Sequence, residues 1–287
     1  MNLLSVPRAE LEASPVSPAV PPKVTSRVRE GILDMWHGVV AWRTWWVLAA
    51  NDIKQRYRRS KLGQLWLTMS MAVSILGLAI LFSVIFNSPL EVYLPYLGLG
   101  FIVWGLIAGL VNDLAIAYVN AGTYLTSYPG PRSAVIYRTI TRNAIMTAHN
   151  LVMVPIIIIF LNVPVNWATL LVIPGLMLIL LNAVWMGMVL GPLCARFRDL
   201  PQLITSIMQL MFFLTPIIYR PEQIMDRLWL LTHLNPFASF LEVVRAPLLG
   251  QVPELRHYGV ILGVTLVGFL IAVPFYGRFR GRIVYWL

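Results

Sequence analysis

Long apolar runs alternate with short polar connections through most of this 287-residue chain. An α-helix needs about 20 apolar residues to cross about 30 Å of membrane hydrocarbon, because each residue advances it by about 1.5 Å. Six runs come close to that length, so we predict an all-α membrane protein with six transmembrane helices. The predicted spans are 62–86, 96–118, 138–161, 168–193, 202–219 and 258–276.

The region before the first span has two different parts. Residues 1–25 contain five prolines and no long apolar run, which predicts a disordered tail without the features of a cleavable signal peptide. Residues 27–48 interleave four tryptophans with charged residues, a pattern typical of an amphipathic helix that lies in the head-group plane. Asp52, with Gln55 three residues later, predicts the start of a second helix.

Residues 221–250 decide the expected topology. Two apolar pieces, 228–234 and 237–249, flank Asn235-Pro236, and neither is long enough to span a membrane. If they formed a seventh span together, the basic C-terminal tail would lie outside, against the positive-inside rule. We therefore expect an outer re-entrant helical hairpin, with both termini and all but four of the 22 Lys and Arg residues on the cytoplasmic side.

This topology divides the chain into three parts. Residues 1–25 are the tail, residues 26–61 are the interfacial helix with a basic segment, and residues 62–287 are the transmembrane domain. Arg138 and Arg142 would lie at the cytoplasmic mouth of the third span.

Composition supports a membrane protein. Hydrophobic residues make up 58% of the chain and charged residues only 12%, whereas about 25% of a soluble domain is charged. The 22 Lys and Arg exceed the 12 Asp and Glu, and in this context they indicate topology and contact with anionic lipids, not nucleic acid. The one cysteine, Cys194, excludes an intrachain disulfide and is expected to be buried or interfacial.

Sequence signatures of enzymes and motors are missing. None of the three lysines follows a glycine, so no P-loop can bind ATP, and no Gly-x-Ser-x-Gly or metal-binding spacing occurs. We expect no catalytic residue, cofactor or metal ion in this chain.

Ionisable residues inside the spans leave alternatives open. Asp113 and His149 fit either interhelical hydrogen bonding or a proton relay. Glu242 and Arg245 lie three residues apart, so a helix brings them to one face, where they can pair. The pair would be a local ion pair or a latch that seals the outer end of a pore.

Aromatic residues give a second set of candidates. Trp66, Phe212, Phe213 and Tyr219 could line a path for sugar rings, or belong to the core or the interfacial belt.

The connection 120–135 predicts a short helix that ends at Pro129-Gly130. Exposed Tyr124, Leu125 and Tyr128 on that helix would indicate a docking site, and the alternative is a plain loop at head-group level.

Four segments carry a family resemblance. They are 52–66 (DIKQRYRRSKLGQLW), 191–199 (GPLCARFRD), 215–219 (TPIIY) and 235–250 (NPFASFLEVVRAPLLG). Together they resemble the membrane permease subunits of ABC-2 type polysaccharide exporters, over about residues 40–287. The last two segments and the closing Arg-Phe-Arg-Gly-Arg favour the O-antigen type over the capsule and teichoic-acid types.

The resemblance implies an N-terminal interfacial helix, six spans and re-entrant gate helices between the last two. It also implies a homodimer whose subunits each dock a separate P-loop ATPase through cytoplasmic coupling helices, with spans one and five lining the channel. Residues 122–133 would form one coupling helix, with Tyr124, Leu125, Tyr128 and Arg132 as its contacts. The basic residues near the pyrophosphate of an undecaprenyl-linked glycan would be Arg56, Arg58, Arg59 and Lys61, although topology and lipid binding also explain them.

The leading hypothesis is therefore a permease that exports a lipid-linked, O-antigen-like polysaccharide across the bacterial inner membrane, driven by ATP hydrolysis on a partner. One alternative is an ABC-2 exporter of teichoic acid, a drug-like molecule or a lipid. Another is a proton-coupled secondary transporter that uses Asp113 and His149. A membrane-bound glycan-modifying enzyme is a third alternative, for which no catalytic carboxylate pair or metal motif is found.

Overall fold

The computed structural model describes residues 24–58, 63, 65–127, 130–220 and 235–287. These residues form helices and connecting segments, and none of them forms a strand. The helices are α1 (Val24–Val40), α2 (Trp42–Tyr57), α3 (Leu65–Ile85), α4 (Leu90–Ala115), α5 (Ala117–Asn120), α6 (Gly122–Ser127), α7 (Ala134–Asn150), α8 (Met153–Phe160), η2 (Trp167–Leu171), α9 (Val172–Arg196), α10 (Leu200–Leu214), α12 (Pro236–Leu248), α13 (Leu255–Phe279), η4 (Arg280–Arg282) and α14 (Ile283–Trp286).

Five helical stretches are long and apolar enough to cross a membrane. They are Leu65–Ile85, Leu90–Ala115, Ala134–Phe160, Trp167–Arg196 and Leu255–Trp286. Each contains most of one predicted span. The predicted span 202–219 corresponds to α10, which has only 15 residues and is shorter than the about 20 needed to cross a bilayer. Whether α10 is a sixth span therefore stays a prediction.

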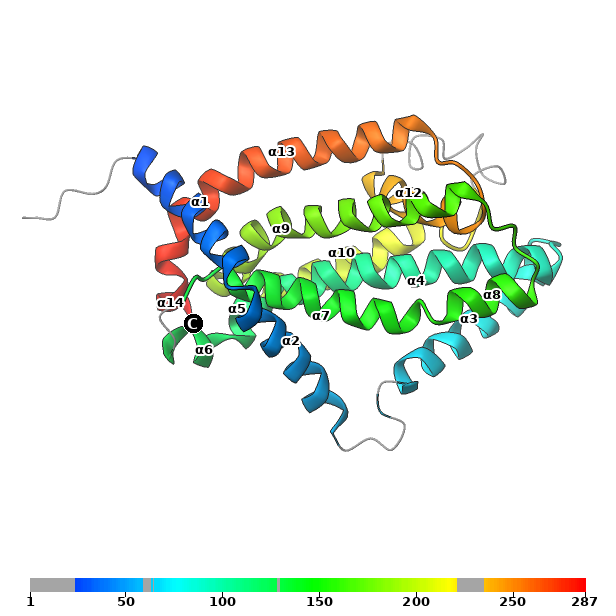
Figure 1. The fold of residues 1–287 in the computed structure, drawn as a ribbon, viewed down its shortest axis with the longest axis horizontal. Coiled ribbons are helices and arrows are strands. Elements are labelled where there is room, and N and C mark those ends of the chain that lie inside the picture. The colour runs from blue at the N-terminus through cyan, green and yellow to red at the C-terminus, as the bar shows by residue number, and fades with distance from the viewer. Residues whose placement is uncertain (1–23, 59–62, 64, 128–129, 221–234) are drawn as a thin grey trace, which may run out of the picture.

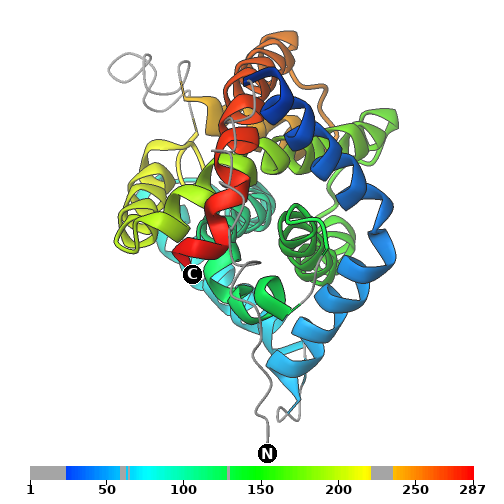
Figure 2. The same ribbon diagram turned by 90° about the vertical axis from the view of Figure 1, so that its left-hand side faces the viewer.

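Helix α4 is the centre of the bundle. It packs against α3, α7, α9, α10 and α12. Of its most apolar window, 72% is buried inside the protein, compared with 17% for the corresponding windows of α3 and α13. Leu97, Leu99, Leu110 and Leu114 are completely buried along it. The core thus forms around α4, while α3 and α13 lie at its outside, as the end-on view shows (Figure 2).

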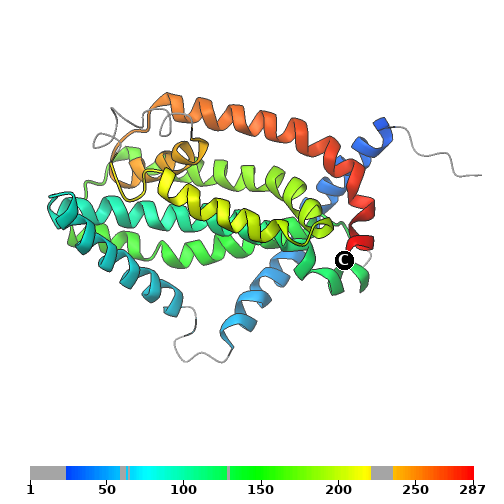
Figure 3. The same ribbon diagram turned by 180° about the vertical axis from the view of Figure 1, so that it is seen from behind.

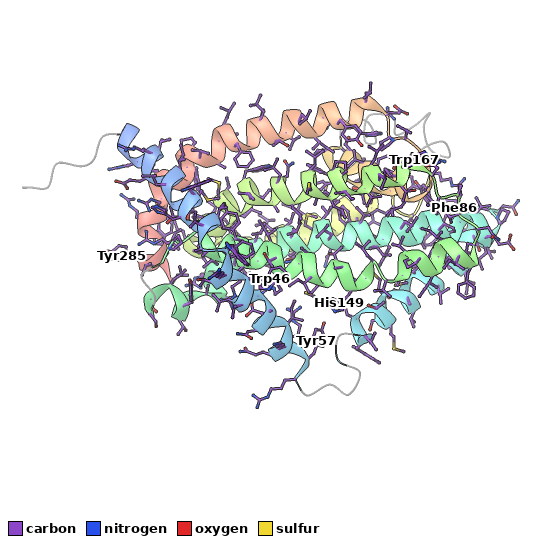
Figure 4. The ribbon with its side chains drawn as sticks, viewed as in Figure 1. Trp46, Tyr57, Phe86, His149, Trp167 and Tyr285 are labelled. Atoms are coloured by element: carbon purple, nitrogen blue, oxygen red, sulfur yellow. The ribbon has the colours of Figure 1, made fainter. Side chains whose placement is uncertain are left out.

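The long helices connect two ends of the molecule (Figure 1). At one end lie α1, α5, α6 and α14, and we call it the α6 end. At the other lie α8, α12 and the beginning of α13, and we call it the α12 end. Large exposed aromatic side chains occur at both, including Tyr285 at the α6 end and Trp167 at the α12 end (Figure 4).

Helix α2 corrects one expectation. A helix was expected to begin at Asp52, with Gln55 as its capping partner, but α2 already begins at Trp42 and runs through both residues. The break with α1 falls at Ala41 instead. Asp52 lies inside α2, and its carboxylate does not cap that helix but binds a partner on another helix, described below. The interfacial position of α1 and α2 stays a prediction.

The second apolar piece of the expected hairpin is the helix α12. The Asn235 side chain accepts a hydrogen bond from the Phe237 backbone N–H at 2.9 Å, and Pro236 occupies the first turn, so both residues favour the start of a helix here. The first piece, 228–234, lies outside the described residues, as do most of the tail, Arg59, Lys61 and Tyr128.

Candidate functional site

The exposed side of α10 carries polar side chains at a helical spacing. Gln202, Ser206 and Gln209 are exposed, and Phe213, which is 65% exposed, continues the series. Steps of four, three and four residues place all of them on one face. An amide that faces hydrocarbon without a hydrogen-bond partner costs at least about 2 kcal/mol. Leu203, Ile207 and Leu210 are exposed beside this series, so the polar residues form a stripe along an otherwise apolar exposed side, and that stripe suits water better than lipid.

Helix α3 also carries a stripe of exposed residues at helical spacing, although the rest of its exposed side is apolar, with Val73 and Val84 among its members. Trp66, Ser70, Ser74 and Gly77 follow one another at steps of four, four and three residues, and all are exposed. The Ser74 hydroxyl donates to the Ser70 carbonyl at 2.9 Å, which satisfies it within its own helix. Both α3 and α10 pack against α4, and they lie on the same side of the molecule (Figure 3). We call their two exposed faces together the α3/α10 face.

The four aromatic candidates separate into two pairs. Trp66, 58% exposed, and Phe213 lie on the α3/α10 face. Phe212 is partly buried and makes an edge contact with Phe101, with ring centroids 5.9 Å apart. Tyr219 lies beyond the end of α10, where its hydroxyl donates to the Leu214 carbonyl at 3.0 Å.

The exposed side of α13 is different. Its middle turns expose only aliphatic side chains and glycine, and no amide or hydroxyl is among the exposed side chains there. The large ones are Leu262, Leu266, Val267, Leu270 and Ile271. Such a face matches lipid hydrocarbon.

At the α12 end, the chain after α10 continues from Thr215 to Arg220 without helical structure. Its backbone carbonyls are bound by side chains of other helices. The Tyr93 hydroxyl donates to the Ile218 carbonyl at 2.5 Å, and Arg245 Nη1 donates to the Pro216 carbonyl at 2.6 Å. These bonds let a non-helical backbone remain inside the protein.

Glu242 and Arg245 pair as their spacing predicted. Arg245 Nη2 lies 2.6 Å from Glu242 Oε2, and the guanidinium carbon lies 4.0 Å from the Tyr96 ring centroid. Arg245 is 1% exposed. Burial alone would lower its pKa, but the Glu242 carboxylate and Tyr96 outweigh that effect and raise the pKa above its ordinary value. The buried guanidinium therefore stays charged. Its role as a gate remains a prediction.

A cavity of about 650 Å³, lined by both charged and apolar residues, lies beside this pair. Its charged and titratable residues come from α4, the segment after α10, α12 and the start of α13, and they include Glu91, Arg220, Glu254, Arg256 and His257. Its charges are partly matched, since Arg256 lies 2.7 Å from Glu254.

A second ionic cluster joins α2, α4 and α7. Arg138 donates two hydrogen bonds to the Asp52 carboxylate, one of them from Nε at 2.8 Å. Arg142 lies 3.5 Å from Asp52 and 2.9 Å from Asp113. The Asn143 amide also donates to Asp113 at 2.9 Å. The cluster fixes α2 against the transmembrane helices.

The proposed relay pair is not brought together. Asp113 is bound by Arg142 and Asn143, whereas His149 Nδ1 lies 2.8 Å from the Ile145 carbonyl of its own helix. The structure describes both side chains and shows no hydrogen bond between them. Figure 4 shows His149 on α7, near the start of α3.

Basic side chains extend from the end of α2. Arg56 and Arg58 are exposed, and Arg56 Nη1 contacts Met146 Sδ at 3.7 Å. They form a cationic end to α2 beside the start of α3.

The short helix expected before Pro129-Gly130 is α6. Tyr124 and Leu125 are partly buried against the hydrophobic core, because α6 packs on α14, and their role as contacts for an ATPase stays a prediction. The exposed residues of α6 are Thr123, Thr126 and Ser127. Arg132, expected to contact a partner, donates a hydrogen bond from its guanidinium to the Arg280 carbonyl.

Sequence reasoning missed two sets of residues. The polar series on α10 could have been predicted from the sequence, since its residues recur at helical spacing within an apolar run. Asp34, which binds the segment before α7, carried no such signal because its partners lie 98 or more residues away. The described residues contain no group of three or more His, Cys, Asp or Glu that could hold a metal ion.

Comparisons with known proteins agree on one family. Residues 43–249 match the ABC-2 type transporter family. A Klebsiella pneumoniae protein named O-antigen export system permease protein RfbA is 25% identical over 241 residues, covering 82% of this chain and 92% of that protein. A Myxococcus xanthus protein of the same name is 24% identical over 204 residues, covering 69% of this chain and 77% of the Myxococcus xanthus protein.

Proposed function

Because this chain belongs to the ABC-2 type transporter family, we propose that it is the permease subunit of an ATP-driven exporter of a lipid-linked, O-antigen-like polysaccharide. The family places it in the membrane, and its five long apolar helices agree. The names of its relatives in Klebsiella pneumoniae and Myxococcus xanthus support a polysaccharide cargo.

The observation that carries the proposal is the α3/α10 face. An exporter subunit needs a surface that tolerates both water and sugar rings. The exposed Gln202, Ser206 and Gln209 offer hydrogen bonds, and the exposed Trp66 and Phe213 offer aromatic faces. Two copies that bring these faces together would enclose a polar path between them, with α13 towards the lipid.

We assign the α12 end to the outer side of the bacterial inner membrane and the α6 end to the cytoplasm. We also assign Arg56 and Arg58, at the end of α2, to the cytoplasmic side, as the positive-inside rule expects. They, with Arg59 and Lys61 from outside the described residues, are suited to bind the pyrophosphate of an undecaprenyl-linked glycan.

The partner ATPase would act at the α6 end. Tyr124 and Leu125 hold α6 against the core, which leaves Thr123, Thr126 and Ser127 exposed for contact. At the opposite end, Glu242 and Arg245 with the buried segment after α10 would close the path when no cargo passes.

A secondary transporter is the weaker candidate. Asp113 is bound by Arg142 at 2.9 Å and by Asn143, and the structure shows no hydrogen bond between it and His149, so no relay joins the two residues. If protons drove transport, Asp113→Asn would abolish it while ATP depletion at a constant proton gradient would not. We expect instead that ATP depletion at a constant proton gradient abolishes transport.

Thiol accessibility tests the path directly. Cys194 is completely buried, so an added cysteine is the main reactive thiol. We expect Gln209→Cys to react rapidly with a hydrophilic, charged maleimide in membranes and Leu266→Cys, the matched control on α13, to react much more slowly. Equal protection of both would contradict an aqueous path along α10.

Cargo and motor are tested in cells. Purification of the native protein should recover a P-loop ATPase, and deletion of this gene should leave glycan in the cytoplasm. Cytoplasmic accumulation of a lipid or a small molecule in place of glycan would support the other ABC-2 exporters. Recovery of the permease alone, with export unaffected by loss of any ATPase, would contradict the proposal.

A further inference from the structure

At the α6 end, the carboxylate of Asp34 on α1 accepts hydrogen bonds from several parts of the chain. The residue is 7% exposed. Its Oδ1 accepts a hydrogen bond from the Arg132 backbone N–H at 3.1 Å, and its Oδ2 accepts one from the Ser133 backbone N–H at 3.0 Å. The Tyr276 hydroxyl of α13 donates to the same Oδ2 at 2.8 Å. One carboxylate thus joins three parts of the chain that are distant in sequence.

The bonds to Arg132 and Ser133 fall where α7 begins. The first N–H groups of a helix have no partner within the helix, and a carboxylate beside them also interacts favourably with the helix dipole. Ser133, which precedes α7, makes no capping bond with its own side chain, and its hydroxyl instead donates to the Asp34 carbonyl at 2.7 Å. Asp34 therefore holds the two residues that lead into α7 from a different helix, whereas the first N–H groups of α7 itself, at Ala134 and Val135, donate to the Pro131 and Arg132 carbonyls.

Close packing prevents α1 from moving independently. A Cβ atom at Gly31 would lie 2.8 Å from the Cα atom of Gly277 on α13, so the two backbones are nearly in contact. A Cβ atom at Gly38 would lie 2.2 Å from Ser133 Oγ. Helix α1 is thus held against both α13 and the start of α7.

Charged and phenolic groups enclose the carboxylate. Arg280 Nη1 lies 3.6 Å from Asp34 Oδ1, and Arg280 Nη2 lies 2.7 Å from Glu30. The Arg132 guanidinium donates to the Arg280 carbonyl, and Tyr118 lies 3.3 Å from Tyr276, hydroxyl to hydroxyl. The set connects α1, the segment before α7, α13 and α5.

We propose that Asp34 is a positioning residue that links the segment after α6 to α1 and α13, so that a displacement of α6 moves these helices together. This inference rests on the proposed function, in which the ATPase acts on α6. Only six residues separate α6 from α7. A displacement of α6 would therefore act on Arg132 and Ser133, whose N–H groups Asp34 binds. Asp34 would then transmit the displacement without touching cargo or ATP.

The first experiment needs no ATPase. Full-length protein in nanodiscs carries spin labels at Arg29→Cys and Ser127→Cys, both exposed positions, while the buried Cys194 stays unlabelled. We expect a narrow distance distribution that broadens with Asp34→Ala and broadens less with Asp34→Asn, which keeps one acceptor oxygen. His37→Gln, at an exposed position outside this network, is the control on α1 and should leave the distribution narrow. An unchanged distribution in folded Asp34→Asn protein would overturn the link.

The second experiment measures ATP hydrolysis and glycan export separately in the complete complex. We expect Asp34→Asn to retain at least half of the hydrolysis while export per ATP falls about tenfold, and the control His37→Gln to remain within twofold on both. A merely structural role would lower both rates in proportion, which would overturn transmission. If the wild-type complex shows no ATP-dependent export, the proposed function fails, and the spin-label distances still decide the link.

Discussion

Helices α10 and α13 both come from apolar segments, yet they expose different faces. Helix α10 exposes Gln202 and Gln209 beside its aromatic residue, whereas the middle of α13 exposes only aliphatic residues such as Leu266 and Leu270. Mean hydropathy does not distinguish two such faces, because it averages over the whole circumference. The surroundings of a membrane helix are therefore judged from its exposed positions, and the difference is the basis on which we propose that α13 faces lipid and α10 faces a polar path.

The largest expected effect concerns Arg245, which binds the segment after α10. Arg245→Ala removes the donor to the Pro216 carbonyl and leaves Glu242 without its partner, which should lower the free energy of unfolding by about 3 kcal/mol. Thermal unfolding in detergent measures this loss. The exposed pair of Arg256 and Glu254 is the control, since Arg256→Ala should cost less than about 1 kcal/mol.

The same variant tests the latch. If Arg245 helps to seal the path, folded Arg245→Ala protein should leak ions faster in liposomes than Arg256→Ala protein. An unchanged leak would reduce Glu242 and Arg245 to an ion pair that stabilises α12.

Matched lysine substitutions test the comparison itself. Leu266→Lys places a charge on the lipid side and should disfavour insertion of α13 by about 2.5–3.5 kcal/mol. Gln209→Lys places it in water and should cost less than about 1 kcal/mol, a size typical of surface changes. The yield of inserted, folded protein measures both. Similar losses for the two variants would remove the distinction between α10 and α13.

Aromatic truncation should affect transport and not stability. Phe213 is 65% exposed, so Phe213→Ala should change the free energy of unfolding by less than about 0.5 kcal/mol. If its ring contacts passing sugars, export should slow severalfold. Leu270→Ala on α13 should leave export unchanged, and export assays in cells distinguish these outcomes.

The smallest expected effect comes from making α10 resemble α13. Gln209→Leu should leave the fold and its stability unchanged within about 0.5 kcal/mol. Export should fall by about half, because one hydrogen-bonding position in the path is lost. Wild-type export in this variant would show that Gln209 faces no cargo.

Much of the helical fold was predictable from apolar length. Five predicted spans correspond to long apolar helices, because burial in hydrocarbon requires about 20 residues whatever their neighbours are. The predicted end of the fifth span at residue 219 is wrong, since α10 ends at Leu214. Thr215 precedes Pro216, which disfavours helical backbone at Thr215, so the sequence contained the reason.

Site residues were predictable only where their partners are close in sequence. Glu242 and Arg245 pair within one turn, and their spacing was sufficient. Asp52 was expected to cap its own helix but pairs with Arg138, 86 residues away. Phe212 and Phe213 are neighbours, so a helix directs them about 100° apart, and only the packing of α4 decides that Phe212 turns inward.

The shortness of α10 has a consequence for the bilayer. At about 1.5 Å per residue, its 15 residues span about 22 Å, whereas the 25 residues of α13 span about 37 Å. A helix of this length surrounded by lipid would have a hydrophobic mismatch with a core of about 30 Å and would thin the membrane. In the proposed dimer a second subunit and water would border α10, and α10 would then be free of that constraint.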